Sequence, residues 1–365
     1  MINDSETDCV YVSSLIRERH RKVFNGLAAI LEKEGLEFGL LTGTKDIWCR
    51  DYMPLQIGRN RFLQYKFFPD YLDNSQDAHS RTIPEEVWKD MCLNIRETSV
   101  VLDGGNIVKC GEKVVMTDKP LKVGNHGYSP AELTRKLEEL FECEIVWLPW
   151  DKVEIFGHSD GIVKYIGNGT VLLTNYSDFN KHFGREFEKV LTKHFTVVPL
   201  RYFSHPRGRN SWAYINFLQT KNTIIIPALG EAEDGEAYNQ ISNAILSASP
   251  HYEGHIHQLH MAEIVQEGGA LNCITWNIQT PWPRVAELKK SIIVKLKEAR
   301  IELEEKAKEV GLPVGLLPGL ENHLRIIENA VHPSVILSLS NLPSEYLNSG
   351  LKALLSSSPK GPENP

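Results

Sequence analysis

The sequence lacks the features that mark several large classes of protein. Acidic residues outnumber basic ones by 47 to 40, giving a formal net charge of −7, so there is no basic excess of the kind that binds nucleic-acid phosphates. No apolar run approaches the ~18 residues of a membrane span. The first residues, Met-Ile-Asn-Asp-Ser-Glu, lack the basic start and apolar core of a signal peptide. These absences argue against nucleic-acid and membrane partners and predict a cytoplasmic protein.

The sequence contains few cysteines, and none of them are closely spaced. The six cysteines stand at positions 9, 49, 92, 110, 143 and 273, without CxxC spacing, so neither a disulfide framework nor a zinc site is predicted. We expect reduced thiols, and small buried ones everywhere except at Cys273. A phosphate-binding loop, a dinucleotide fingerprint, HExxH and GxSxG are also missing. The sequence therefore predicts neither a metal nor an organic cofactor.

Most of the chain has the pattern of an α/β protein. Of its 365 residues, 42% are hydrophobic and 24% charged, which is an ordinary globular composition. Runs rich in Val, Ile, Thr and aromatic residues alternate with stretches of helical apolar spacing, and this alternation predicts an α/β domain over residues 1–284. The predicted strands are 62–67, 99–102, 113–116, 161–166, 170–174, 196–200 and 223–227, and the predicted helices are 11–34, 84–96, 129–141, 180–194 and 234–247.

The remaining residues form a region of different composition. Residues 285–310 are rich in Glu, Lys, Leu and Ala, with opposite charges four positions apart, which predicts a helix. Helical spacing returns at 320–330 and 343–356, and the last ten residues predict a disordered tail. We therefore predict a helical extension over residues 285–365, which would join copies of the chain or bind a protein partner.

A thiol, a histidine and three carboxylates each stand beside turn-forming glycine or proline. Cys273 lies in Gly-Gly-Ala-Leu-Asn-Cys-Ile-Thr-Trp (268–276), and His158 and Asp160 lie in Gly-His-Ser-Asp (157–160). Asp51 lies in Trp-Cys-Arg-Asp-Tyr-Met-Pro (48–54), and Asp103 begins Asp-Gly-Gly-Asn (103–106). Taken singly, Cys273 could be a core cysteine and Asp103 part of a tight turn. Together they could hold a planar cation between acids while a thiolate attacks its central carbon.

These motifs, in this order, resemble those of the guanidine-modifying (pentein) superfamily, and within it the agmatine deiminase and bacterial peptidylarginine deiminase group. The resemblance covers about residues 40–283. It implies a propeller of five small αβ units around a pseudo-fivefold axis, with the active site in the central channel. Several positions depart from the agmatine deiminase pattern. Asn272 stands where histidine is usual and Asp103 where glutamate is usual, Trp276-Asn277-Ile278 replaces a glutamine-rich stretch, and Ala213 replaces a serine.

The resemblance also implies a role for each residue. Cys273 would be the nucleophile and His158 the general acid and base, positioned by Asp103. Asp51 and Asp160 would hold the guanidinium, and Arg50 would pin its loop. If the segment around His158 is extended, His158 and Asp160 share one face. The lesser assignments are Trp48 as an aromatic pocket wall or a core residue, Asn106 and Asn216 as minor pocket residues, and Arg207 and Arg209 as a carboxylate clamp or solvated surface.

The function implied by the resemblance is hydrolysis of a guanidinium substrate through a covalent amidino-cysteine, with agmatine giving N-carbamoylputrescine and ammonia as the default. Arginine, a peptidyl arginine or another guanidine are alternative substrates. An amidinotransferase is an alternative enzyme, because it shares the covalent intermediate. A pentein-fold scaffold that uses its helical extension is an alternative of another class, which the retained Cys273, His158 and acids disfavour.

Overall fold

The computed structural model describes residues 1–73, 78–91, 93–202, 210–280 and 283–309, together with Leu324, Ile327 and Pro343. The chain divides into two compact units. One consists of residues 1–88 and 94–279, and the other of residues 89–93 and those from 280 onward.

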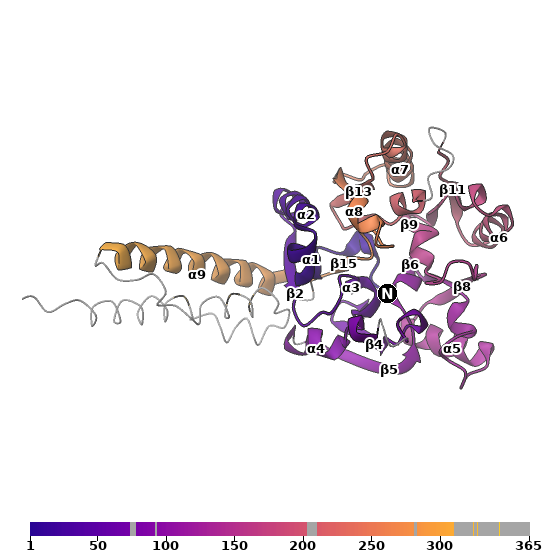
Figure 1. Cartoon of the computed structure of the whole chain (residues 1–365), viewed down its shortest axis with the longest axis horizontal. Helices are drawn as coiled ribbons and strands as arrows, with labels where there is room; N and C mark the ends of the chain where they lie inside the picture. Colours follow the sequence, from indigo (N-terminus) through magenta and orange to yellow (C-terminus); the bar gives the residue numbers. More distant parts are fainter. Residues whose placement is uncertain are drawn as a thin grey trace, which may run out of the picture. The chain divides into compact units, whose positions relative to one another are not determined.

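The first unit is a ring of five modules in its described residues, and each module is a three-stranded sheet (Figure 1). In every sheet an inner strand pairs antiparallel with a middle strand, and the chain then crosses through a helix to an outer strand parallel to the middle one. In inner, middle, outer order the sheets are β3 (Leu55–Gly58), β4 (Arg61–Lys66), β5 (Ile95–Val101); β6 (Val108–Cys110), β7 (Lys113–Thr117), β8 (Glu144–Leu148); β9 (Val163–Gly167), β10 (Thr170–Leu173), β11 (Thr196–Pro199); β12 (Leu218–Gln219), β13 (Thr223–Ala228), β14 (His255–His260); and β15 (Thr275–Ile278), β1 (Cys9–Ser13), β2 (Glu37–Leu41).

The last sheet closes the ring, because its strands come from both ends of the unit. Strand β1 pairs with β15 in the register Val10 to Asn277. The five-module pentein architecture implied by the resemblance is therefore confirmed. The helices of the unit are α1 (Ser14–Arg19), α2 (Arg21–Lys33), α3 (Cys49–Tyr52), α4 (Pro84–Trp88), α5 (Pro130–Phe141), α6 (Lys181–Leu191), α7 (Asp234–Ala248) and α8 (Ala262–Val265).

Helix α5 shows how local sequence sets these elements. The Ser129 side chain accepts a hydrogen bond from the backbone of Glu132, whose carboxylate accepts one from the Ser129 N–H in return, and Pro130 occupies the first turn. Two predicted helices are too long. Residues 11–13 of the predicted 11–34 helix belong to β1, and the helix predicted for 84–96 gives way to β5, because pairing in a sheet overrides weak helical spacing.

One irregular turn precedes each inner strand, and these turns carry the sequence motifs. Before β3 comes α3, before β6 the 3₁₀ turn η5 (Gly104–Asn106), before β9 the turn η7 (Ser159–Gly161), and before β12 the turn η9 (Ser211–Tyr214). Before β15 the backbone N–H of Ile274 donates to the Ala270 carbonyl, closing a turn around Cys273. The motifs are thus equivalent positions of a repeated module, which is why residues far apart in the sequence meet.

The second unit contains α9 (Pro283–Glu309), so the helix predicted for 285–310 forms. Its buried side chains are spaced four, three and four positions apart, as one face of a helix requires: Ile292, Leu296, Ala299 and Leu303. The predictions for 320–330, for 343–356 and for the tail fall outside the described residues, apart from three single positions.

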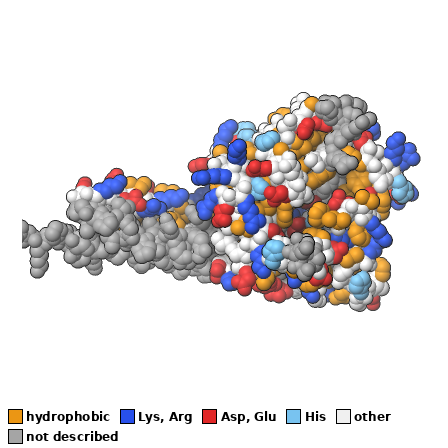
Figure 2. Space-filling view, in the orientation of Figure 1, with side chains coloured by type: hydrophobic (Ala, Val, Ile, Leu, Met, Phe, Trp, Pro, Cys, Tyr) orange, Lys and Arg blue, Asp and Glu red, His pale blue; other side chains and the backbone are white. Residues whose placement is uncertain are grey.

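The distribution of charged side chains on the surface of the first unit is consistent with the modest net charge of the sequence. Acidic and basic side chains are interspersed over the face seen in Figure 2. Among the described helices, none is both long and apolar enough to span a bilayer. The five described cysteines, Cys9, Cys49, Cys110, Cys143 and Cys273, are all unpaired and buried.

Candidate active site

Cys273 lies in the turn before β15 and lines a cavity of about 440 Å³, although the residue is only 8% exposed. Its Sγ atom lies 3.4 Å from Oδ1 of Asn216 and 3.9 Å from Oδ2 of Asp160. The same Asn216 oxygen accepts hydrogen bonds from the backbone N–H groups of Asn272 and Cys273, at 3.0 and 3.3 Å. Asn216, predicted as a minor residue, therefore fixes the turn that carries the thiol.

Two glycines allow this turn to form. Gly268 has a φ of +96°, a left-handed conformation that glycine adopts without strain. A Cβ atom on Gly269 would lie 2.0 Å from Cζ3 of Trp48. Trp48 packs against the turn and the neighbouring hydrophobic core and is not among the cavity-lining residues. Of its two predicted roles, the structure favours the core residue over the pocket wall.

His158 also lines the cavity, and two carboxylates flank its ring. Its Nδ1 lies 3.8 Å from Oδ1 of Asp51 and its Nε2 lies 3.4 Å from Oδ2 of Asp103. Burial disfavours the charged ring, but Asp51, Asp103 and Asp160 outweigh it and raise the pKa of His158 to about 9. At neutral pH the side chain is therefore an imidazolium that can donate a proton.

The segment around His158 is not a strand, so the condition under which His158 and Asp160 would share one face of an extended chain is not met. Gly157, with a φ of +64°, breaks the extended backbone, and the 3₁₀ turn η7 begins directly after His158. Both side chains nevertheless line the same cavity.

Asp51, on α3, lies beside His158 and is not among the residues of the cavity wall. Its Oδ1 accepts a hydrogen bond of 2.9 Å from the Gly105 N–H. Burial, together with repulsion from Asp103 and Asp160, raises the pKa of Asp51 to about 7, although His158 opposes the rise. This carboxyl group is thus partly protonated near neutral pH, and an added cation would favour its charged form.

Asp103 precedes η5, where two glycines permit close packing. A Cβ on Gly104 would lie 2.0 Å from the Arg50 carbonyl oxygen, and one on Gly105 would lie 2.5 Å from Nδ1 of His158. Within the described part of the chain, Oδ1 of Asp103 is buried without a hydrogen-bond partner. The carboxylate therefore has capacity left for a further donor.

Asp160 links the cavity to the turn at Cys273. Its Oδ2 accepts a hydrogen bond of 2.8 Å from Nδ2 of Asn272. Burial, followed by the negative charges of Asp160 and Asp51, raises the pKa of the Cys273 thiol well above its usual value. With no cation bound, the site therefore holds a neutral thiol.

The rest of the cavity is aromatic and polar. Its volume suits a small ligand. Apart from His158, none of the described residues that line it is basic: these include Glu154, Phe156, Thr174, Tyr176, Phe179, Asn210, Trp212 and Gln266. In the described ranges no group of three or more His, Cys, Asp or Glu residues is arranged to hold a metal ion.

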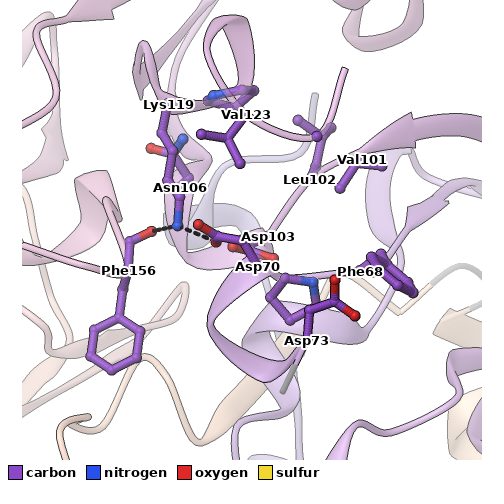
Figure 3. A pocket seen from close by; sticks show the side chains of 13 residues that line it. Phe68, Asp70, Asp73, Val101, Leu102, Asp103, Asn106, Lys119, Val123 and Phe156 are labelled. Carbon is purple, nitrogen blue, oxygen red and sulfur yellow. Dashed lines mark hydrogen bonds and ion pairs between the residues drawn. The ribbon is translucent and has the colours of Figure 1, made fainter. Parts of the chain in front are cut away.

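A second cavity, of about 220 Å³, is lined by Asp103 and Lys119 and shares Phe156 with the first (Figure 3). The Lys119 ammonium lies 2.7 Å from Oδ1 of Asp70 and donates to the carbonyl oxygens of Ile155 and Phe156 at 2.8 and 3.1 Å. Lys119 thereby ties the loop at Asp70 to the segment that leads into His158.

Asn106 lines this second cavity rather than the first. Its Oδ1 accepts a hydrogen bond of 2.8 Å from the Thr117 N–H, and its Nδ2 donates to the Thr117 carbonyl at 3.2 Å. Both amide atoms are thus engaged with β7, which indicates a structural role.

The structure brings six predicted residues together and leaves two apart. Sγ of Cys273 lies beside Asp160 and Asn216, the His158 ring lies between Asp51 and Asp103, and Cys273, His158 and Asp160 line one cavity. Trp48 instead packs against the hydrophobic core, and Asn106 bonds to β7. Arg207 and Arg209 fall outside the described residues. Sequence reasoning missed the aromatic lining residues Phe156, Tyr176 and Trp212. Their only signal is that each lies in an irregular segment close to a motif or strand end.

The comparisons with known proteins agree with this geometry. The sequence pattern of the Porphyromonas-type peptidyl-arginine deiminases matches residues 9–281. An agmatine deiminase of Pseudomonas aeruginosa (strain LESB58) is 29% identical over 230 residues, which cover 52% of this chain and 60% of that enzyme. This chain thus matches about three fifths of the length of that curated relative.

Solved structures share the fold. An agmatine deiminase of Enterococcus faecalis superposes with a TM-score of 0.62, and one of C. jejuni with 0.61. Each is 17% identical, and each alignment covers 76% of this chain and 95% of the solved one. At this identity the likeness shows the five-module fold and not the substrate.

Proposed function

Because this chain belongs to the Porphyromonas-type peptidyl-arginine deiminase family, we propose that it is a cysteine-dependent hydrolase of a guanidinium substrate, with agmatine as the substrate. The observation that carries this proposal is the unbalanced charge beside the thiol. Asp51, Asp103 and Asp160 all act on one histidine. Burial, together with the neighbouring negative charges, raises the pKa values of Asp51 and Cys273, and a bound positive charge would oppose both shifts. A guanidinium, which stays protonated at any working pH, supplies that charge.

The first half of the reaction begins when the substrate cation enters. Its charge favours the ionised forms of Asp51 and of the Cys273 thiol, whose proton passes to solvent. The thiolate then forms a bond from Sγ to the central guanidinium carbon. His158, protonated below about pH 9, donates its proton to the departing nitrogen. The C–N bond breaks, ammonia leaves, and a cationic amidino-cysteine remains beside Asp160.

The second half uses the same residues in reverse roles. His158, now neutral, takes a proton from water, and the water oxygen bonds to the amidino carbon. The tetrahedral intermediate collapses: the C–S bond breaks, the Cys273 thiolate leaves, and the hydroxyl proton passes to solvent as the C=O bond of the ureido product forms. The products are a ureido compound and ammonia, so one water molecule is consumed for each C–N bond that is hydrolysed. Asp103, 3.4 Å from Nε2 of His158, orients the ring and stabilises its charged form through both halves.

The cavity wall favours a substrate whose far end is cationic. Glu154 is an exposed acidic residue at this wall. Of the described lining residues, none is a lysine or arginine that could pair with the carboxylate of arginine. Phe156 and Trp212 offer apolar faces for a short alkyl chain. Agmatine, an alkyl chain with a guanidinium at one end and an ammonium at the other, matches this set better than arginine.

A direct assay tests the activity. We expect the purified protein to release ammonia and a ureido product from agmatine in preference to arginine or an arginine-containing peptide. Cys273→Ser should reduce turnover at least about a thousandfold, since hydroxyl cannot replace the thiolate under these conditions. Cys110→Ala is the matched control, because Cys110 is buried in another module. Turnover that survives in Cys273→Ser would contradict the proposed nucleophile.

A second assay tests the substrate's far end. Glu154→Gln should raise KM for agmatine about tenfold while leaving KM for butylguanidine unchanged, because butylguanidine has the same chain without the ammonium. An equal change for both guanidines would show that Glu154 does not recognise the far end. Preference of the wild type for arginine or the peptide would overturn agmatine and leave the chemistry intact.

A further inference from the structure

Polar side chains occur at a matching position on all five inner strands and are buried inside the ring. Lys109 and Lys164 are two of them, and each residue is less than 10% exposed. Neighbouring inner strands meet through such groups, since Nδ2 of Asn277 donates to the Gln219 carbonyl at 3.1 Å. The full set, which we call the channel ring, is Gln56, Lys109, Lys164, Gln219 and Asn277.

Asp4 lies within the channel ring and pairs with both of its lysines. The N-terminus lies near the middle of the five modules (Figure 1). Oδ1 of Asp4 lies 2.7 Å from Nζ of Lys109, and Oδ2 lies 2.9 Å from Nζ of Lys164. Burial opposes ionisation of Asp4, but the two lysines and Arg50 outweigh it and hold the pKa of Asp4 well below its usual value. Asp4 is therefore a permanent anion at the centre of the fold.

A continuous series of contacts joins Asp4 to the thiol. Nζ of Lys164 lies 3.3 Å from Oδ1 of Asn272. The other end of that amide donates to Oδ2 of Asp160 at 2.8 Å. The same Asp160 oxygen lies 3.9 Å from Sγ of Cys273. Asn272 thus accepts from a lysine on one side and donates to a site carboxylate on the other, which fixes which way its amide points.

We infer that Asp4 is a positioning residue for the guanidinium site, acting through Lys164 and Asn272 on Asp160. The inference rests on the proposed function. Without its anion, the buried Lys164 ammonium would seek another carboxylate, and Asp160 is one amide away. Asp160 would then turn from the substrate, and the thiol would experience uncompensated positive charge. Other charged groups acting on Asp4 or the thiol are Lys109, Arg50 and Asp51.

Asp4→Asn in the full chain tests this, with two readouts. KM for agmatine should rise about tenfold with a smaller change in kcat, because a substrate contact weakens in the ground state as well. The pH midpoint for alkylation of Cys273 by iodoacetamide, followed on the Cys273 peptide by mass spectrometry, should fall by about one unit. Glu6→Gln is the matched control, since it removes one charge from the same 3₁₀ turn, Asp4–Glu6, at a position that is exposed, and should change neither.

The double variant Asp4→Asn, Lys164→Met separates positioning from loss of packing. Removing both charges should return the alkylation midpoint most of the way to the wild-type value, which damage to the fold would not do. If Asp4→Asn does not fold, Lys164→Met alone should move the midpoint upward. An unchanged midpoint in whichever single variant folds, or a shift that the double variant does not reverse, would overturn the inference. Alkylation needs no substrate, so this arm stands even if no guanidine is hydrolysed and the proposed function fails.

Discussion

Two buried charged clusters lie at opposite ends of the Asn272 amide, and they differ in how well their charges are paired. In the channel, Asp4 contacts two lysines at 2.7 and 2.9 Å and its pKa is held low. In the site, Asp51 and Asp103 share His158 at 3.8 and 3.4 Å, and the pKa of Asp51 is raised to about 7. Both clusters are buried, but only the second borders a cavity of about 440 Å³.

The comparison shows that burial of charge does not by itself mark a functional site. A carboxylate with close cationic partners has a low pKa and needs nothing further, so the channel cluster is complete within the protein. A buried carboxylate with too few cationic partners, such as Asp51, has a raised pKa, and its charged form gains stability from a bound cation. The site cluster is therefore the one arranged for a ligand.

The largest effect should come from removing one site carboxylate. We expect Asp160→Asn to lower kcat/KM by about a hundredfold to a thousandfold, because the guanidinium loses a charge-assisted partner near the reacting carbon. The same change should lower the pH midpoint for alkylation of Cys273, since Asp160 helps to raise the pKa of that thiol. A loss of activity with an unchanged midpoint would mean that Asp160 does not set the field at the thiol.

The next effect concerns stability against pH. The pKa of Asp51 is raised to about 7 in the folded state. Its contribution to the free energy of unfolding is therefore fully present below the pKa of the unfolded chain, near 4, and is lost as pH rises through about 7. The pKa of His158 is raised to about 9 in the folded state. Its contribution to the free energy of unfolding is therefore fully present below the pKa of the unfolded chain, near 6.5, and is lost as pH rises through about 9. Because the two groups interact, we expect a joint loss of about 3 kcal/mol between pH 5 and pH 9.

Thermal unfolding of Cys273→Ser with and without saturating agmatine measures this loss, because that variant binds substrate without turnover. The bound guanidinium should reduce the loss of stability with rising pH, so the ligand should raise the Tm more at pH 8.5 than at pH 5.5. The channel cluster should not make the free energy of unfolding depend on pH between 5.5 and 8.5, since the pKa of Asp4 lies far below this range. A ligand-induced shift that is equal at both pH values would contradict the view that the site lacks positive charge.

A smaller effect tests how closely the site cluster is packed. A Cβ on Gly105 would lie 2.5 Å from Nδ1 of His158 and 2.7 Å from Oδ1 of Asp51. Gly105→Ala should therefore displace the ring and lower kcat about tenfold. Gly127→Ala is the matched control, because a Cβ at that position would have no neighbour within 4 Å. Equal activity of the two variants would show that His158 tolerates displacement.

The site cluster could largely be predicted from the sequence, whereas the channel cluster could not. Cys273, His158, Asp51, Asp103 and Asp160 sit in irregular motifs beside glycine, and such turns mark functional loops. Lys109 and Lys164 are single lysines inside short apolar strands, Val-Lys-Cys and Val-Lys-Tyr, a pattern that ordinarily means a solvent-facing side chain. Only closure of the ring turns those positions inward, and closure depends on β1 pairing with β15 across the whole unit.

The fold shows the same division between local and long-range information. Strands β4, β7, β10, β11 and β13 were predictable because each is a compact run of β-forming residues. The inner strands β6, β12 and β15 were not, because they are two to four residues long and mix polar with apolar side chains. Helix α5 was predictable to within one residue from its helical apolar spacing and from Ser129 and Pro130 at its start, while the 3₁₀ turn after His158 had no such signal.

The smallest effect should come from the second unit, which lies outside both clusters. On α9, Val294 and Ile301 are 52% and 57% exposed and lie seven positions apart, so they share one face of the helix. We expect Val294→Ser, Ile301→Ser to leave kcat/KM for agmatine within about twofold, because every residue proposed for chemistry lies in the first unit.

Light scattering on the same variant tests the sequence-based prediction that this extension joins copies of the chain. A lower molar mass than the wild type, with turnover retained, would assign association to α9 and catalysis to the ring. A tenfold loss of turnover would instead show that α9 contributes to the site, and the separation between a catalytic ring and an independent extension would fail.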